Sequence, residues 1–239
     1  MAVTSSLKDR WSRLPADWII KGGLLEFRAG KGLGESVAAL KVLVSILLLA
    51  KNATASAHDP DQGTLMISYD DLMSLTDLSR AMVSIGIKRL QALSRVSVTR
   101  GKKGEPNRYH LPDYGSGDHW TKISNRRLFR GGNSSRISVL HDLSTRRTCD
   151  LDALKLYLLL SAMQDKSGAG AMLGYEKITE YSGIPQNRVR RAVSVLVEHN
   201  LIKVSEGPAP DIETHNPPNR YRLLGTGVAV SDEKEAAPA

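Results

Sequence analysis

The chain has 239 residues, 41% of them apolar and 24% charged, which is the composition expected of a globular domain rather than of a disordered or fibrous chain. Its 33 Lys and Arg against 25 Asp and Glu give a formal charge of +8, which favours polyanionic partners, nucleic acid first among them. The single cysteine, Cys149, excludes an intramolecular disulfide and a cysteine zinc cluster, and it indicates a reducing, cytoplasmic compartment.

Residues 1–17 are predicted to be a polar lead-in, with a short helix around Leu7–Leu14. The first strong helix is predicted over Glu35–Lys51, where apolar residues recur at helical spacing. Its apolar run, Val37–Ala50, is 14 residues long and contains Lys41, so it is too short and too polar for a membrane span of about 20 residues. We therefore expect a buried helix, no membrane association and, without a signal-like N-terminus, no secretion.

Two further helices are predicted next. Ser68 is a suitable N-cap for a helix over Tyr69–Leu75, and Asp77 or Ser79 for a second helix that ends near Leu93. This order predicts a helix-turn-helix, whose second helix is the candidate reader of DNA bases.

A β-hairpin, or wing, is predicted to follow the second helix. Its strands are Val96–Arg100 and Arg108–Leu111, joined by the turn Gly101–Pro106.

The same plan recurs further along the chain. Tyr69–Val98 superposes on Tyr175–Val204 at a constant offset of 106 residues, with apolar positions opposite apolar positions. The second copy is predicted to contain three helices followed by two wing strands, over Asp150–Gln164, Tyr175–Tyr181, Pro185–Asn200, Ile202–Ser205 and Arg220–Leu224.

Shorter matches flank the repeat. The tripeptide Asn-Arg-Tyr closes both copies, at 107–109 and 219–221. Upstream, a weaker correspondence aligns the first copy with the second as follows: Trp18 and Lys21 with Trp120 and Lys122, Phe27-Arg28 with Phe129-Arg130, and Ala39-Leu40-Lys41 with Ala153-Leu154-Lys155.

These patterns predict a mainly α protein with small β-hairpin wings, an α+β fold of two tandem winged helix-turn-helix domains related by internal duplication. The expected divisions are a lead-in (1–17), a first domain (18–113), a basic linker (114–149) with a short helix at Arg136–Leu143, a second domain (150–224) with an upstream strand near 120–130, and a disordered tail (225–239).

The second recognition helix is the stronger candidate for base reading. Its i, i+4, i+7 spacing turns Val189, Val193 and Leu196 inward. The residues expected on the outer face are of types that pair with bases or phosphates: Gln186, Asn187, Arg188, Arg190, Arg191 and Ser194. A solvated basic helix face is the alternative interpretation of this pattern.

The first domain offers fewer basic groups on its helix and more on its wing. The candidates on its recognition helix are Ser79, Arg80, Ser84 and Lys88, and those on its wing are Arg100, Lys102, Lys103 and Arg108. A wing with lysines at its tip suits phosphates or the minor groove. The linker adds Arg126, Arg127 and Arg130. The second wing loop contains Asp211 and Glu213 and is expected to be a poorer DNA contact.

No residue set in the chain suggests catalysis. The six histidines are scattered and none has a metal-ligand spacing, so no metal site is expected. Gly30–Ser36 resembles a phosphate loop in composition but not in spacing, and is interpreted as an entry to the first helix. The recurrent Trp and Tyr residues are expected to pack in the core rather than to stack on bases. The chain is thus predicted not to be an enzyme and to need no cofactor.

The segment Leu173–Pro185, followed by Val189, Val193, Leu196 and 200–204, resembles the winged helix-turn-helix domains of bacterial regulators. Two such domains, each with an Ala-Leu-Lys helix before it and an Asn-Arg-Tyr strand after it, resemble plasmid and phage replication initiators. The resemblance covers about residues 18–224. It implies binding to repeated origin sites or to an operator, as a monomer or homodimer, without a nucleotide cofactor.

We therefore expect a sequence-specific double-stranded DNA-binding protein of a bacterial mobile element, associated with the nucleoid or a plasmid, that acts as a replication initiator or a transcriptional regulator such as a repressor. No small-molecule ligand is evident. The alternative is a structural adaptor whose tandem winged helices bind protein partners, as in chromosome-partition complexes. Charge favours the first, because an adaptor has no need of an arginine-rich helix face and a lysine-rich wing.

Overall fold

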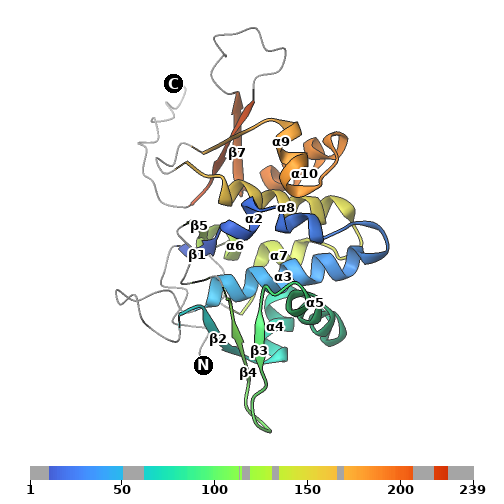
Figure 1. The fold of residues 1–239 in the computed structure, drawn as a ribbon, viewed down its shortest axis with the longest axis vertical. Helices are drawn as coiled ribbons and strands as arrows, with labels where there is room; N and C mark the ends of the chain where they lie inside the picture. Colours follow the sequence, from blue (N-terminus) through green and yellow to red (C-terminus); the bar gives the residue numbers. More distant parts are fainter. Residues whose placement is uncertain are drawn as a thin grey trace, which may run out of the picture.

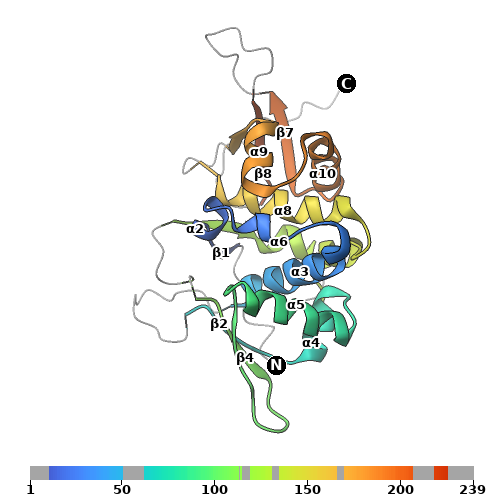
Figure 2. The same cartoon turned by 45° about the vertical axis from the view of Figure 1, so that its right-hand side comes forward.

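The structure, a computed structural model, describes residues 11–50, 62–112, 114, 119–130, 135–165, 170–206 and 218–225. It is a mixed α+β protein, in which helices predominate and the strands form small antiparallel sheets. Two long helices lie across the middle of the molecule, and a β-hairpin projects from each end of the long axis (Figure 1). The same arrangement is visible after a turn of 45° (Figure 2).

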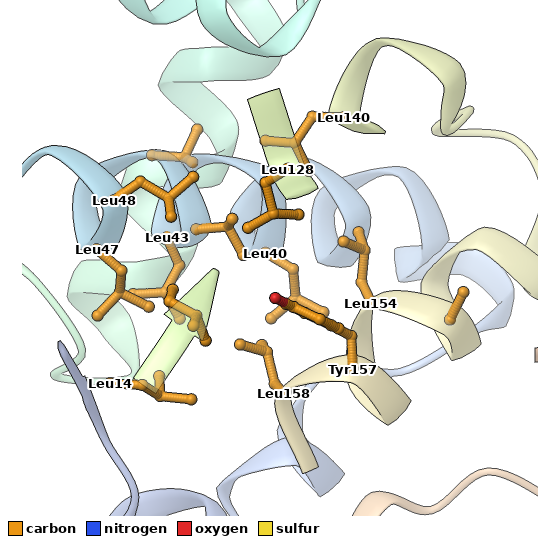
Figure 3. Packing of buried hydrophobic residues seen from close by; sticks show 14 of the residues in the cluster. Leu14, Leu40, Leu43, Leu47, Leu48, Leu128, Leu140, Leu154, Tyr157 and Leu158 are labelled. Atoms are coloured by element: carbon orange, nitrogen blue, oxygen red, sulfur yellow. The ribbon is translucent and has the colours of Figure 1, made fainter. Parts of the chain in front are cut away.

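The two central helices are α3 (Leu33–Leu49) and α8 (Thr148–Ala162). Both are apolar around most of their circumference, and a helix of this kind needs cover on all sides. Side chains of α3, such as Leu40 and Leu43, lie toward Tyr157 and Leu158 of α8 (Figure 3). The core therefore runs between the two halves of the chain as well as within each half.

Length and composition alone would allow one helix among the described residues, over Gly30–Leu49, to cross a membrane. In this structure 78% of its most apolar window is buried inside the protein. The prediction of a buried helix at this position is confirmed.

A two-stranded antiparallel sheet joins the two halves beside α3 and α8. Its strands are β1 (Trp11–Pro15) and β5 (Trp120–Ser124). The predicted helix around Leu7–Leu14 is wrong from Trp11 onward, and residues before Trp11 lie outside the described part of the chain. Ser12 and Leu14 face inward, where the Ser12 hydroxyl donates to the Leu48 carbonyl at 3.0 Å. Buried and less buried residues alternate along a strand, but in β1 this alternation extends over only five residues. So short a pattern does not distinguish a strand from a helix, which explains the error.

This sheet also corrects the upstream part of the sequence repeat. β1 and β5 correspond at an offset of 109 residues, so the counterpart of Trp120 is Trp11, not Trp18. The rings of Trp11 and Trp120 stack with centroids 5.8 Å apart. The register sets Arg13 opposite its own counterpart, Lys122, which gives the contact approximate two-fold symmetry.

Each of these strands leads into a short helix, α2 (Asp17–Ile20) after β1 and α6 (Asn125–Phe129) after β5. Two 3₁₀ turns, η1 (Gly23–Glu26) and η2 (Gly30–Gly32), then lead to α3. The strand expected near 120–130 thus ends at Ser124. The prediction of a linker over 114–149 missed that part of this segment belongs to the hydrophobic core, since Ile123, Leu128 and Phe129 are buried.

The first half contains β2 (Thr64–Ile67), α4 (Tyr69–Thr76), α5 (Arg80–Ala92), β3 (Ser97–Thr99) and β4 (Asn107–His110), and its sheet has the order β2-β4-β3. Both predicted helices and both predicted hairpin strands are present. Ser68 and Asp71 form a capping box at the start of α4, and the Ser79 side chain caps α5. Strand β2 was not predicted.

The second half repeats this order with β6 (Ala171–Leu173), α9 (Tyr175–Ser182), α10 (Gln186–Glu198), β7 (Ile202–Glu206) and β8 (Asn219–Leu223), in a sheet of order β6-β8-β7. The predicted helices and hairpin strands are again confirmed, and β6 was missed. Helix α7 (Ser138–Asp142) confirms the short helix expected between the halves. The predictions for the loop 207–217 and the tail after Gly225 concern residues outside the described part.

A buried lysine occupies equivalent places in the two central helices. The Lys41 ammonium donates to the Thr76 carbonyl at 3.2 Å, and the Lys155 ammonium donates to the Phe27 carbonyl at 3.0 Å. Desolvation by burial lowers the pKa of each from 10.5 to about 8.

These lowered pKa values predict a specific pH dependence. The unfolded chain keeps both protons up to about pH 10.5, whereas the folded protein releases them near pH 8, so the free energy of unfolding should rise with pH in this window. We expect a gain of about 2 kcal/mol per lysine between pH 7.5 and 9.5. Urea unfolding of the wild type and of a Lys41→Met, Lys155→Met variant measures it. An equally steep rise in the variant would contradict the assignment.

Candidate nucleic-acid interface

Helix α10 presents a polar surface at its N-terminal end. Its buried face consists of Val189, Ala192, Val195 and Leu196. Of the residues predicted to read DNA, four are exposed on the first two turns: Gln186, Asn187, Arg190 and Arg191. The turn from α9 is set by Gly183, at φ 68°, and by the Thr179 hydroxyl, which donates to the Ile184 carbonyl at 2.7 Å. The tertiary structure therefore holds these four side chains together at one end of the helix.

Arg188 differs from its neighbours on α10. Its guanidinium lies against the carboxylate of Asp152 on α8, with Nε 2.9 Å from Oδ2 and Nη2 3.1 Å from Oδ1. The Asp152 side chain is only 2% exposed, and burial raises its pKa although Arg188 and Lys155 act to lower it. Arg188, expected on the outer face, is 37% exposed, but its guanidinium is engaged by Asp152 and anchors α10 to the central helix.

Ser194 lies farther along α10 and is half-buried. Its hydroxyl donates to the Arg190 carbonyl at 3.1 Å, which is a bond within the helix. The polar surface of α10 is thus concentrated in the residues before it.

Helix α5 has a smaller polar surface. Arg80 is exposed at its start, where it pairs with Asp70 at 3.2 Å and lies over the Tyr69 ring. Lys88 is exposed, Ser84 is half-buried and Ser79 serves as the N-cap. This agrees with the expectation that the first helix offers fewer basic groups than the second.

The packing of α5 against α3 depends on a glycine. A Cβ built on Gly86 would lie 2.9 Å from the backbone carbonyl carbon and oxygen of Ala38. Only a residue without a side chain lets the two helix backbones approach this closely. The equivalent residue of α10, at the offset of 106, is the buried Ala192.

The first hairpin carries its charge at the tip. Lys102 and Lys103 are exposed there, and the turn is closed by the Glu105 carboxylate, which accepts from the Lys102 backbone N–H at 3.2 Å. Arg100 and Arg108 are exposed near the base of the turn. All four predicted residues of this hairpin thus lie on one projecting structure.

The three linker arginines have different environments. Arg126 and Arg127 are exposed on α6. Arg130 contacts the Asp142 carboxylate through Nη1 at 2.7 Å and the Nδ1 atom of His199 through Nη2 at 2.6 Å. Burial, together with the Arg130 charge, lowers the pKa of His199. Arg130 therefore connects α6 and α7 to the C-terminal end of α10.

Figure 1 shows how these surfaces are arranged. Helices α5 and α10 lie on the same side of the molecule, at the right in this view, and the two hairpins point toward opposite ends of the long axis. The predicted residues therefore do not converge on one pocket. Those of α5 and α10 lie along one side of the molecule, whereas α6 lies near its centre and the first hairpin projects from one end.

Sequence reasoning missed the acids that hold this arrangement together. Asp152 and Asp150 are buried in α8, and Asp150 accepts from Arg147 Nε at 2.8 Å. A signal was present, because two acids and a lysine interrupt an otherwise apolar helix and buried charges need partners. Within the described residues, no group of three or more His, Cys, Asp or Glu could hold a metal ion.

Comparisons of the chain with protein-family models, with curated proteins and with solved structures gave no match.

Proposed function

We propose that this protein binds double-stranded DNA in a sequence-specific manner through two tandem winged helix-turn-helix domains, and acts as a replication initiator or transcriptional regulator. The observation that carries the proposal is the exposed cluster of Gln186, Asn187, Arg190 and Arg191 at the start of α10. In a helix-turn-helix the N-terminal residues of the second helix contact base edges in the major groove. Gln and Asn pair with adenine and Arg with guanine.

The surrounding structure supports this assignment. Each candidate reading helix follows a shorter helix across a tight turn and is followed by a hairpin, as in the winged helices that the sequence resembles. The net charge of +8 and the lysines at the first hairpin tip supply the attraction to phosphates that non-specific binding needs. The single cysteine supports a cytoplasmic setting, and the same resemblance supports one on a bacterial plasmid or phage.

The approximate two-fold symmetry between β1 and β5 has a consequence for the DNA site. If that symmetry extends to the two halves, α5 and α10 approach the duplex in opposite orientations. A single chain then reads two half-sites that are inverted relative to each other, about one helical turn apart. Because the exposed residues of α5 and α10 differ, the two half-sites have different sequences.

Selection of bound sites from random duplex DNA tests the function. We expect enrichment of one sequence with two conserved blocks about 10 base pairs apart. The purified protein should then shift this duplex at a salt concentration at which random DNA stays free. If it shifts no duplex even at low salt, the proposal is wrong, and the adaptor that binds protein partners becomes the better account.

A further inference from the structure

We propose that a central bridge, made of Lys31 and the loop Ser144–Arg147, forms a third contact to the DNA backbone between the two half-sites. This inference rests on the proposed function and adds a site to it. Neither of its two phosphate-contacting cations, Lys31 and Arg146, belongs to a recognition helix or a hairpin.

The loop of the bridge lies between the two candidate reading helices. On one side, a cavity of about 350 Å³ is lined by Leu143, Ser144 and Thr145 together with Ser79 and Met82 from the start of α5. On the other side, the residues just before the loop contact the end of α10: the Asp142 carboxylate is 3.8 Å from His199 Nδ1. Leu143 also shares an apolar pocket with Val195, Leu196 and His199. The loop therefore lies between the start of α5 and the C-terminal end of α10, and we infer that a duplex bound to both helices passes beside it.

The entry to α3 lies beside the same loop. A Cβ built on Gly34 would be 3.7 Å from the Thr145 carbonyl and 3.6 Å from the Met82 Cε atom. Lys31 precedes Gly34 by less than one helical turn. Figures 1 and 2 both show the blue segment before α3 on the side of α5 and α10, between them along the long axis. The glycine-rich segment Gly30–Ser36, which resembles a phosphate loop only in composition, thus lies beside the loop Ser144–Arg147.

The bridge offers cations that the protein does not neutralise. Arg147 is held by Asp150 and by the Asp142 carbonyl, at 2.8 and 3.1 Å, and these bonds fix the loop. Lys31 and Arg146 are exposed, and neither side chain has a hydrogen-bond or ion-pair partner among the described residues. Glu35, in the first turn of α3, and Glu198, at the end of α10, are exposed acids.

Phosphates are the groups that this chemistry suits. Arg and Lys contact phosphate oxygens and position a protein on the duplex without reading its sequence. Between two successive major-groove contacts, the backbones that border the minor groove face the protein. A fixed central contact there would make binding depend on the spacing of the half-sites.

The test uses the duplex that the wild-type protein selects, with Lys31→Ala, Arg146→Ala, the double variant, and the charge-matched control Lys21→Ala on the exposed C-cap of α2. Each bridge substitution should weaken binding to this duplex about tenfold. It should also reduce by about 1 the salt slope, that is, the slope of log affinity against log salt concentration, whereas the control should change neither quantity. Arg146→Lys should keep the slope. In a hydroxyl-radical footprint, the double variant should lose protection between the half-sites and keep it within them.

The outcomes separate the bridge from the function on which it rests. A double variant with wild-type affinity, slope and central protection overturns the bridge and leaves the proposed function standing. A wild-type protein that binds no duplex overturns both. Loss of protection in the centre alone, with the half-sites still covered, supports the bridge.

Discussion

Replacing Arg188 by Ala should lower the free energy of unfolding at pH 7 by about 3 kcal/mol, because the substitution leaves the Asp152 carboxylate buried without its partner. Asp152 is 2% exposed, and Lys155 is the remaining cation that acts on it. The reverse change, Asp152→Ala, should cost less, since the Arg188 side chain is 37% exposed and can turn toward solvent. Urea unfolding of both variants measures the difference.

Two further measurements make this prediction specific to the ion pair. The loss in Arg188→Ala should shrink as the pH falls toward 5, because burial without the arginine raises the pKa of Asp152 further and protonation removes the buried charge. A double variant, Arg188→Ala with Asp152→Leu, should recover part of the stability. If Arg188→Ala proves as stable as the wild type, α10 does not depend on this contact. The unfolding measurement also bears on DNA binding by Arg188→Ala. We expect weaker binding by this variant to result from a displaced α10 rather than from a lost base contact.

Replacing Arg190 by Ala should weaken binding to the selected duplex about 10- to 100-fold, which corresponds to about 1–3 kcal/mol, with much less effect on random DNA. Arg190 is exposed on the outer face of α10, between the buried residues Val189 and Ala192. Truncation should therefore leave the free energy of unfolding nearly unchanged. Titrations on both duplexes, with an unfolding curve for each variant, measure these effects.

The matched comparison is the hairpin variant Lys102→Ala, Lys103→Ala. Both lysines are at the exposed tip, so the double variant should weaken specific and random duplexes alike and reduce the salt slope by about 2. Equal losses of Arg190→Ala on all sequences would refute base reading by α10. A double lysine variant that loses affinity only for the selected duplex would refute phosphate binding by the hairpin.

Local patterns in the sequence were enough to predict the longer helices, the serine caps of α4 and α5 and both hairpins, but not the short helices α2 and α6. The apolar periodicity of the residues before Leu93, and the serines at 68 and 79, act over one or two turns, and each serine side chain accepts from a backbone N–H three residues along the chain. The short strands β1, β2 and β6 escaped prediction. They have three to five residues each, and their partners lie at least 40 residues away in the sequence.

By itself, then, the sequence determined a repeated order of helix, helix and hairpin, together with a basic net charge. It could not determine which arginine of α10 pairs with a buried acid. Arg188 lies at the edge of the buried stripe, and its direction depends on Asp152, which is 36 residues away and comes close only when α10 packs on α8. The tertiary structure likewise decided the pairing of β1 with β5 and the position of the 144–147 loop. These depend on contacts between distant segments, whose free energy becomes available only after the chain has closed the loops that connect them.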